Sequence, residues 1–592
     1  MPPPRLQQEL DKLDGSIAFR SSATHAHHTW ARTFHAYPEL YIRPSSLAEI
    51  QQLVTLARRC RRRLLVVGSG HSPSDLTCTS SWMVNLDHYS DIVSVVREHK
   101  RVVVQAGIRL KDLNSRCAQE YGLVMANLGS VDDQSIAGAI ATGTHGSSLR
   151  HGLLSQPVKS LGLVLANGRL VRCSASQNPE LFRAALVSLG ALGIVVEVEY
   201  ELTEVTNIAW EQSLETLSYI LENWNKDLWT QQEYTRVWWL PYTRRAIIWK
   251  AKRTTEPTRI AHSSWYGGAL GFHTYHILLY ISSFFPPILP AVEWFVFGMQ
   301  YGFHPGTVTS GVEPLQQGLL MDCLYSQFVN EWAIPLSKGP EAINRLSAWI
   351  NGDQKKSGIP FSNHNLYVHS PVEVRVADTS TTIPRPYLDP SVHDGPTLYL
   401  NATLYRAYTR DPPCHARYYE AFEWLMKDLG GRPHWAKNFA HVTQPEISSM
   451  YGDALSQWLK VRQDVDPDGM FAGHWHRRMV LPETTELPLL PLEEQEVATR
   501  NATQGGLIWY GDKGERGIDA PLHVDTKASD GRSWWFGGSG SGELEKPLRS
   551  SSSEESFDVL HGAEASVLLH DDDHEDGVSM RARDAASGGY TG

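Results

Sequence analysis

Three features that would assign this 592-residue chain to a large class of proteins are missing from its sequence. Its six cysteines are scattered without a C-x-x-C pair, which excludes a disulfide framework or a zinc site and indicates free thiols in a reducing compartment. Basic residues do not predominate: the net charge is -11 and the pI is about 6.1, so no nucleic-acid partner is expected. The sequence matches neither G-x-G-x-x-G nor a P-loop, so Rossmann and P-loop phosphate binding do not apply.

Targeting and membrane-spanning signals are also weak. The first residues, "MPPPRLQQELDKLDG", have no apolar core and carry acidic residues early, so they predict neither a secretory signal nor a typical transit peptide. The longest apolar region, residues 269–299, is interrupted by Pro286, Pro287 and Pro290. Two interpretations of it stay open: a buried or surface helical hairpin, or peripheral or re-entrant contact with a membrane.

The length of the chain and its 42% of hydrophobic residues predict at least two domains. Short β-branched runs, glycines and two or three helices between 38 and 206 predict one α+β domain. Within it, "ANGR" (166–169) predicts a hairpin turn, and "SLAEIQQLVTLARRC" a helix that begins at Ser45 or Ser46. The predicted division is an N-terminal segment (1–37), a first domain (38–206), a second domain rich in Trp and Tyr (207–483), and a disordered acidic tail (484–592) containing "HDDDHED".

Two glycine-rich stretches could bind a cofactor. In "VVGSGHSPSDL" (66–76), the turn Gly68-Ser69-Gly70 follows a predicted strand and is followed at once by His71. Such a turn can bring backbone N–H groups close to phosphate oxygens, although by itself it is more typical of an ordinary turn. The second stretch, "NLGSVDDQSIAGAIATGTHGSS" (127–148), consists largely of small residues. It suits equally a chain lying along a large polyphosphate cofactor and a helix packed tightly on a sheet.

Two further stretches carry charge. In "SPVEVRVA" (370–377), Glu373 and Arg375 alternate with valines, so a strand would place both charges on one face. That pattern fits a half-solvated strand or a paired acid and base facing a polar substrate. In "GRPHWAKNFA", Lys437 follows a histidine and a tryptophan after a turn. This basic loop is either functional or simply exposed.

The four motifs, in this order, resemble the vanillyl-alcohol-oxidase superfamily of flavoproteins. Within it they are most similar to the sugar-1,4-lactone oxidases, and especially to the fungal D-arabinono-1,4-lactone oxidases. The resemblance covers about residues 20–483. It implies an α+β, two-domain vanillyl-alcohol-oxidase/PCMH-type fold, with an FAD-binding domain and a C-terminal substrate domain that caps the flavin. One departure is Ala436, where the family loop often has glycine.

The resemblance also implies the cofactor and the residues that hold it. The cofactor is FAD, joined covalently through its 8α-methyl carbon to His71. Plant-type lactone dehydrogenases have no histidine at that place and carry alanine instead of Gly129, whose missing methyl would leave room for dioxygen. The histidine favours the tethered, fungal and animal kind of enzyme, and Gly129 favours an oxidase over a dehydrogenase. The residues assigned to FAD are His71, Gly68, Ser69, Gly70, Ser72, Gly129, Ser130, Ser135, Gly138, Thr142, His145 and Ile194.

The reaction that the resemblance implies is oxidation of D-arabinono-1,4-lactone by dioxygen to D-erythro-ascorbate and hydrogen peroxide. Hydride would pass from C2 of the lactone to flavin N5. Arg375 and Lys437 would stabilise the negative charge, and Glu373 would bind substrate hydroxyls. Related L-gulono- or L-galactono-lactones and alditols are alternative substrates. A mitochondrial membrane location is implied as well. A non-catalytic membrane scaffold remains a competing hypothesis, and it predicts no bound flavin.

Overall fold

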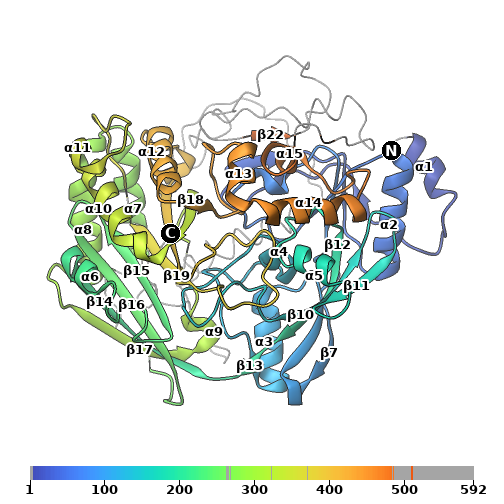
Figure 1. Cartoon of the computed structure of the whole chain (residues 1–592), viewed down its shortest axis with the longest axis horizontal. Coiled ribbons are helices and arrows are strands. Elements are labelled where there is room, and N and C mark those ends of the chain that lie inside the picture. The colour runs from blue at the N-terminus through green and yellow to red at the C-terminus, as the bar shows by residue number, and fades with distance from the viewer. Residues whose placement is uncertain are drawn as a thin grey trace, which may run out of the picture.

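Figure 1 shows the chain as a computed structural model, which describes residues 4–259, 261, 266, 269–321, 323–369, 371–482, 485 and 508–510. We call residues 4–206 the first half and residues 207–443 the second half. The predicted tail lies outside the described residues, except for Thr485 and the strand β22 (Ile508–Tyr510). That strand pairs in parallel with β3 (Phe34–Ala36).

A small sheet in the first half carries the first motif. Its order is β1-β4-β6-β5, and β5 pairs in parallel with β6. The helix α2 (Leu47–Cys60) follows β4 and begins after Ser46, whose hydroxyl accepts a hydrogen bond from Glu49 N at 3.2 Å. This confirms the second of the two predicted start residues. The strands are β1 (Ser21–Ser22), β4 (Leu40–Ile42), β5 (Leu64–Val67) and β6 (Trp82–Asn85).

A second sheet of five antiparallel strands, ordered β11-β10-β12-β8-β7, completes the first half. The predicted turn at 166–169 joins β10 to β11, with Gly168 at a φ of +79°. The strands are β7 (Ile92–Val96), β8 (Arg101–Gln105), β10 (Val158–Val164), β11 (Leu170–Ser174) and β12 (Ile194–Glu201). The other elements are α1 (Pro4–Leu10), β2 (His27–His28), β9 (Leu123–Val124), α3 (Leu110–Tyr121), α4 (Ile136–Ala141), α5 (Pro179–Ala185) and β13 (Thr203–Glu204).

The second half is built on an eight-stranded antiparallel sheet, ordered β17-β14-β16-β15-β19-β20-β18-β21. Strand β19 (Val372–Ala377) lies between β15 and β20, and all six of its residues are buried. The half-solvated interpretation of this strand is therefore wrong. The other strands are β14 (Asn207–Thr216), β15 (Tyr234–Leu240), β16 (Arg245–Thr254), β17 (Val308–Pro314), β18 (Gln327–Pro335), β20 (Thr397–Tyr405) and β21 (Arg432–Pro433). The helices beside them are α6 (Leu217–Asn223), α9 (Leu315–Gly318), α10 (Gly339–Ile350), α11 (Gln354–Ser357) and α12 (His415–Asp428).

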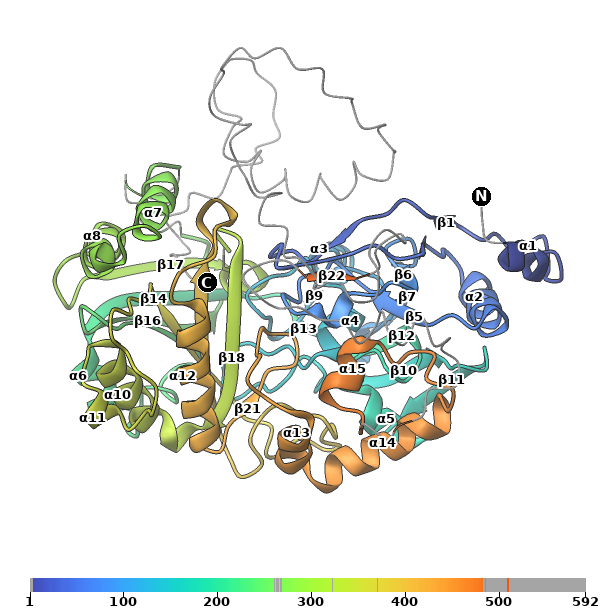
Figure 2. The ribbon, with the colours of Figure 1, turned by 90° about the horizontal axis from the view of Figure 1, so that it is seen from above.

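The last three helices return to the first half, as Figures 1 and 2 show by the orange ribbon beside blue and teal elements. They are α13 (Gln444–Tyr451), α14 (Asp453–Val465) and α15 (His474–Met479). Leu64 N donates to Met470 O at 2.9 Å, and Arg478 pairs with Asp75 at 2.9 Å. One buried apolar cluster also runs through both halves. The domain boundaries drawn from the sequence stay a prediction.

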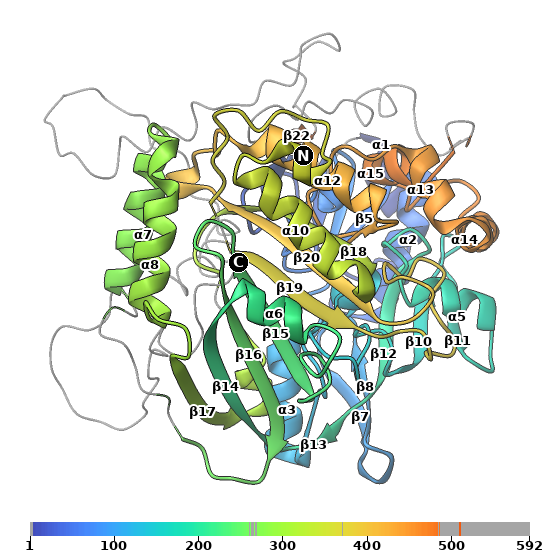
Figure 3. The same cartoon turned by 60° about the vertical axis from the view of Figure 1, so that its left-hand side comes forward.

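The apolar region 269–299 forms two helices that lie side by side at the edge of the second half (Figure 3). They are α7 (Ala269–Ser282) and α8 (Leu289–Tyr301), with a short turn of 3₁₀ helix between them at Pro286–Ile288. A helical hairpin, one of the two predicted interpretations, is thus present. Among the described residues, no helix combines the length and the apolar character that crossing a membrane requires.

Candidate active site

The turn that carries His71 meets the small-residue segment directly. It begins where β5 ends, and Gly70 has a φ of +71°, in the left-handed region that favours glycine. A Cβ atom on Gly68 would overlap the hydroxyl of Ser135, which caps α4 by accepting a hydrogen bond from Gly138 N at 3.3 Å. The fold therefore brings the two glycine-rich motifs together, as the resemblance implied.

His71 is held beside an indole ring. Its imidazole stacks on Trp30 with ring centroids 5.7 Å apart, and its Nε2 is buried without a hydrogen-bond partner among the described residues. Burial lowers the pKa of His71 to about 4. The ring is therefore neutral near pH 7, which leaves a ring nitrogen with a free lone pair.

A cleft lies next to this turn in the first half. Its lining is rich in small residues, including Gly68, Ser135, Gly138, Ser188 and Gly193. Such a lining lets a ligand approach backbone N–H groups and hydroxyls closely. The cleft and the unpartnered nitrogen of His71 both fit FAD.

A cluster of charged groups is buried in the second half. Glu373 and Arg375 project from β19, and Glu331 comes from β18 on the other side of β20. Arg375 Nη2 donates to Glu331 Oε1 at 2.5 Å, and Arg375 Nε lies 3.5 Å from Glu373 Oε2. Lys437 Nζ lies 3.4 Å from Glu331 Oε2. Ser130, from the small-residue segment, lies 3.4 Å from Arg375 Nη1 and links the cluster to the first half.

The two carboxylates of this cluster, Glu331 and Glu373, have pKa values shifted in opposite directions. Burial would raise the pKa of Glu331, but the charges of Arg375 and Lys437 outweigh it and hold this pKa well below its usual range. Burial raises the pKa of Glu373, and the charge of Arg375 offsets this only in part. Burial would lower the pKa of Arg375, yet the two glutamates raise it above its usual value. The cluster therefore holds one firmly ionised carboxylate and one that binds a proton more readily.

His145, which belongs to the small-residue segment of the first half, also contacts the charged cluster. Its Nε2 lies 3.5 Å from Glu331 Oε1, and its ring stacks on Tyr399 with centroids 3.6 Å apart. Burial lowers the pKa of His145, and Arg375 lowers it further. The hydroxyl of Tyr399 is in turn hydrogen-bonded to Ser391 Oγ at 2.8 Å.

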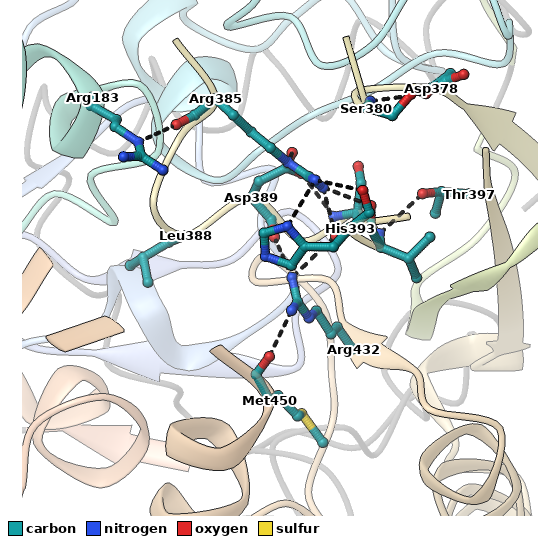
Figure 4. Close-up of polar contacts among 12 residues, drawn as sticks. Arg183, Asp378, Ser380, Arg385, Leu388, Asp389, His393, Thr397, Arg432 and Met450 are labelled. Atoms are coloured by element: carbon teal, nitrogen blue, oxygen red, sulfur yellow. Dashed lines mark hydrogen bonds and ion pairs between the residues drawn. The ribbon is translucent and has the colours of Figure 1, made fainter. Parts of the chain in front are cut away.

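Figure 4 shows how the loop between β19 and β20, which contains Ser391, is held in place. Arg385 pairs with Asp389 at 2.6 Å and donates to the carbonyl of Ser391 at 3.1 Å. Arg432 donates to the same carbonyl at 3.2 Å and to Met450 O at 2.7 Å, which ties the loop to α13. Two arginines thus fix the segment that positions Tyr399.

Three potential metal ligands come together in the cluster: the side-chain nitrogens of His145 and His434 and a carboxylate oxygen of Glu331 lie within 4.8 Å of one another. Arg375 and Lys437 already compensate the charge of Glu331. A divalent cation there would be repelled by both. The arrangement therefore favours an ion-pair centre over a metal centre.

Several polar atoms of the cluster are buried yet make no hydrogen bond within the described part of the chain. They are Glu331 Oε2, Glu373 Oε1, Arg375 Nε and His145 Nε2. Three of them make only ion-pair contacts of 3.4 to 3.5 Å, with Lys437, Glu373 and Glu331 respectively. Buried polar atoms without hydrogen bonds are costly, so such a set is typical of a site whose hydrogen-bond partners arrive with a ligand. Both donors and acceptors are present, which suits a ligand rich in hydroxyl groups.

Comparison with known proteins agrees with this geometry. The family model described as D-arabinono-1,4-lactone oxidase matches residues 198–479. A protein of Neurospora crassa is 51% identical over 84% of this chain and 93% of its own length. The D-arabinono-1,4-lactone oxidase of Yarrowia lipolytica is 40% identical over 77% of this chain and 98% of its own length. The chain belongs to the D-arabinono-1,4-lactone oxidase family.

Like its family, the chain carries an FAD-binding domain, because the model of that domain matches residues 38–174. Among solved structures, cholesterol oxidase from Brevibacterium sterolicum aligns with a TM-score of 0.65 at 14% identity, covering 81% of this chain and 99% of that one. Together with the match to the FAD-binding domain, this likeness confirms the predicted α+β, two-domain vanillyl-alcohol-oxidase fold.

The resemblance to lactone oxidases assigns residues to FAD binding and to catalysis, and the structure places many of them in two groups. Glu373, Arg375, Lys437, Ser130 and His145 meet in the charged cluster. Gly68, Ser135 and Gly138 line the cleft. Of the others, Ile194 is buried next to the lining residue Gly193, and Thr142 donates to Gly138 O at the end of α4. Their binding roles stay predictions, as do those of Ser69, Gly70, Ser72 and Gly129.

Sequence reasoning missed Glu331, which makes the shortest contact of the cluster. The sequence nonetheless indicates that Glu331 is unusual, because "QFVNEWAIP" places this acidic residue within an otherwise largely apolar strand. Tyr399 was missed too, since an aromatic residue in a strand ordinarily indicates only packing.

Proposed function

We propose that the chain catalyses the FAD-dependent oxidation of D-arabinono-1,4-lactone by dioxygen, giving hydrogen peroxide and a 2-keto lactone that enolises to D-erythro-ascorbate. The lactone loses the hydrogen on C2 and the proton of its C2 hydroxyl, and dioxygen takes up both with two electrons. Membership of the family supports this proposal. The observation that carries it is the buried charged cluster, in which polar atoms of Glu331, Glu373, Arg375 and His145 make no hydrogen bond among the described residues. Three of these atoms make only ion-pair contacts of 3.4 to 3.5 Å.

The side chains of the charged cluster would have two roles, stabilising negative charge and binding the substrate hydroxyls. Arg375 and Lys437 would stabilise the negative charge that develops on the C2 oxygen, since positive charges already held in place act strongly there, and Arg375 is also buried away from water. Glu373, whose pKa is raised by burial, would bind the hydroxyls of the lactone and take up a proton from them. FAD, when bound, supplies the acceptor for the hydride and passes the electrons on to dioxygen.

A covalent tether between His71 and FAD is part of the proposal. The neutral imidazole and the unpartnered Nε2 support it. The new nitrogen–carbon bond replaces one C–H bond of the 8α-methyl group and the N–H bond of the imidazole. Dioxygen receives the two hydrogens and leaves as hydrogen peroxide, so the step balances.

Acid precipitation tests this tether. Wild-type protein is expected to stay yellow after precipitation and washing, whereas His71→Ala should release all its flavin. Acid-stable flavin in His71→Ala protein would contradict the assignment of His71.

The preferred substrate can be decided with an oxygen electrode. We expect D-arabinono-1,4-lactone to give the highest kcat/KM in a panel that includes L-gulono-1,4-lactone, L-galactono-1,4-lactone and an alditol. A higher value for one of the others would move the assignment to that substrate on the same site.

We also propose that the α7–α8 hairpin docks on the surface of a membrane, and that this membrane is mitochondrial. Large apolar side chains on the hairpin support the docking: Phe285 is 66% exposed, Trp294 54% and Phe284 51%. The hairpin also exposes large apolar or aromatic side chains at Leu270, Ile277, Tyr280, Ile281 and Phe295, and side chains of this kind enter the interfacial layer of a bilayer. The location rests on the resemblance to fungal lactone oxidases alone.

Flotation with phospholipid vesicles tests the docking. We expect wild-type protein to float with the vesicles and the double variant Phe284→Ser/Phe285→Ser to stay in solution. Ile383→Ser is the matched control, because Ile383 is 93% exposed in a loop away from the hairpin. Equal flotation of the double variant and the control would contradict docking through the hairpin. Fractionation of cells, with the protein outside the mitochondrial membranes, would contradict the location.

A further inference from the structure

The turn that carries His71 depends on two supports. On one side, Trp30 N donates to Gly70 O at 2.7 Å while its ring stacks on the imidazole. On the other side, the carbonyl of Pro73 accepts two hydrogen bonds, from Thr33 Oγ1 at 2.7 Å and from Asn438 Nδ2 at 2.8 Å. Thr33 belongs to the first half, but Asn438 belongs to the second.

Asn438 connects this turn to the charged cluster. Its backbone N donates to Val329 O at 2.7 Å, and its side-chain Oδ1 accepts from Val329 N at 3.0 Å. Val329 lies on β18 two residues before Glu331, and Asn438 directly follows Lys437. One side chain thus joins the His71 turn, the Lys437 loop and the strand of Glu331.

The second half also holds the segment beneath Trp30. Arg406 Nη1 donates to Arg32 O at 3.0 Å, and Ser326 Oγ donates to Ala31 O at 2.6 Å. Arg406 and Ser326 contact each other at 3.1 Å. Arg406 is 3% exposed and is fixed by an ion pair with Asp411 at 2.7 Å. The segment that stacks on His71 is therefore anchored on a buried arginine that is itself paired with Asp411.

We propose that Asn438 and the Ser326–Arg406 pair are positioning residues for the covalent attachment of FAD to His71. The second half completes the turn of His71, so attachment requires that the two halves be docked. This proposal rests on the proposed tether and adds to it residues that touch neither FAD nor substrate.

Geometry explains why such distant residues matter. A bond forms only when the reacting atoms are held about 3–3.5 Å apart in the right direction, and a displacement of about 1 Å can slow a reaction about a hundredfold. The segment 68–73 contains two glycines, so its own backbone constrains His71 weakly. The hydrogen bonds to Pro73 and to the 30–33 segment supply the missing constraint.

The test follows covalent attachment itself rather than turnover. Full-length protein is purified at intervals after induction, and acid-stable flavin is measured as a fraction of total bound flavin. Asn438→Asp is the main variant, because an aspartate still accepts from Val329 N but cannot donate to Pro73 O. Asn363→Ala is the matched control: the half-buried Asn363 also donates to a backbone carbonyl of the second half, Trp349 O at 2.7 Å, but not near His71.

We expect attachment in Asn438→Asp to be slower by about tenfold or more, with total bound flavin and the unfolding midpoint close to those of Asn363→Ala. Attachment within twofold of wild type in Asn438→Asp would overturn the proposal. Ser326→Ala is expected to slow attachment in the same way, and a wild-type rate there would remove the Ser326–Arg406 pair from it. Acid-stable flavin in His71→Ala would instead refute the tether, so the two failures are distinguishable.

Discussion

Arg375 and Glu331 form a buried ion pair across the central sheet of the second half, with Nη2 and Oε1 2.5 Å apart. The two residues lie on β19 and β18, which are separated by β20. Glu331 is fully buried and also faces Lys437 and His145. It therefore balances the two cations that we expect to act on the substrate.

Replacement of Glu331 tests this balance. Glu331→Gln removes the negative charge but keeps the shape of the side chain, so Lys437 and Arg375 lose the carboxylate between them and Arg375 keeps its contact with Glu373. We expect the free energy of unfolding to fall by about 3 kcal/mol, measured by chemical denaturation. Glu341→Gln, which removes ion pairs at the surface, should change it by less than about 1 kcal/mol. An equally small effect of both changes would show that the pair contributes little.

Glu423 should make stability depend on pH. It lies on α12 and accepts hydrogen bonds from Ala440 N at 3.0 Å and His441 N at 2.9 Å, just beyond Lys437. Burial raises its pKa from 4.5 to about 7, although these N–H groups offset part of the effect. Because the folded state binds this proton more tightly, the stabilisation is complete below pH 4.5 and is lost as the pH rises through about 7.

The matched measurement compares wild type with Glu423→Gln. The difference in their free energies of unfolding, wild type minus variant, should fall between pH 5 and pH 8 by up to roughly 3 kcal/mol, at about 1.4 kcal/mol per pKa unit. A difference that stays constant over this range would contradict the raised pKa.

Gly129 is expected to control the reaction with dioxygen. A Cβ atom at this position would lie 3.0 Å from Thr144 Cγ2, so Gly129→Ala fits only with a small shift and fills the space beside His145 O. We expect turnover with dioxygen to fall several-fold while turnover with an artificial electron acceptor is retained. Gly162→Ala in β10 is the control, because the nearest atom to its Cβ, Glu197 Cβ of β12, would lie 3.4 Å away. An equal loss with both acceptors would instead indicate a distorted site.

The sequence predicted those parts of the site and of the fold that are local in the chain. In the site, alternation placed Glu373 and Arg375 on one face of a strand. In the fold, the start of α2 at Ser46 and the 166–169 turn follow from local capping and turn chemistry. It could not place Glu331 beside Arg375, because that contact depends on the order of strands in the sheet. Nor could alternation show that both faces of β19 are covered, since burial depends on elements distant in the sequence.

The return of α13–α15 to the first half was missed for a similar reason. The contact between Leu64 and Met470 joins residues about four hundred positions apart, and no local pattern encodes it. The hydrogen bond from Asn438 to Pro73 likewise joins residues 365 positions apart. Contacts of this kind assemble the site from both halves, so local reasoning recovers its parts but not their arrangement.

Oxygen consumption by wild type and Arg375→Met, each with D-arabinono-1,4-lactone as substrate, tests the central claim most directly. Wild type should consume one dioxygen and release one hydrogen peroxide per lactone oxidised. Arg375→Met should bind as much FAD but lose at least about a hundredfold in kcat, because a charge that stabilises the transition state is gone. Equal rates in the two proteins, or no oxygen consumption by flavin-loaded wild type, would contradict the assignment of this cluster as the site of lactone oxidation.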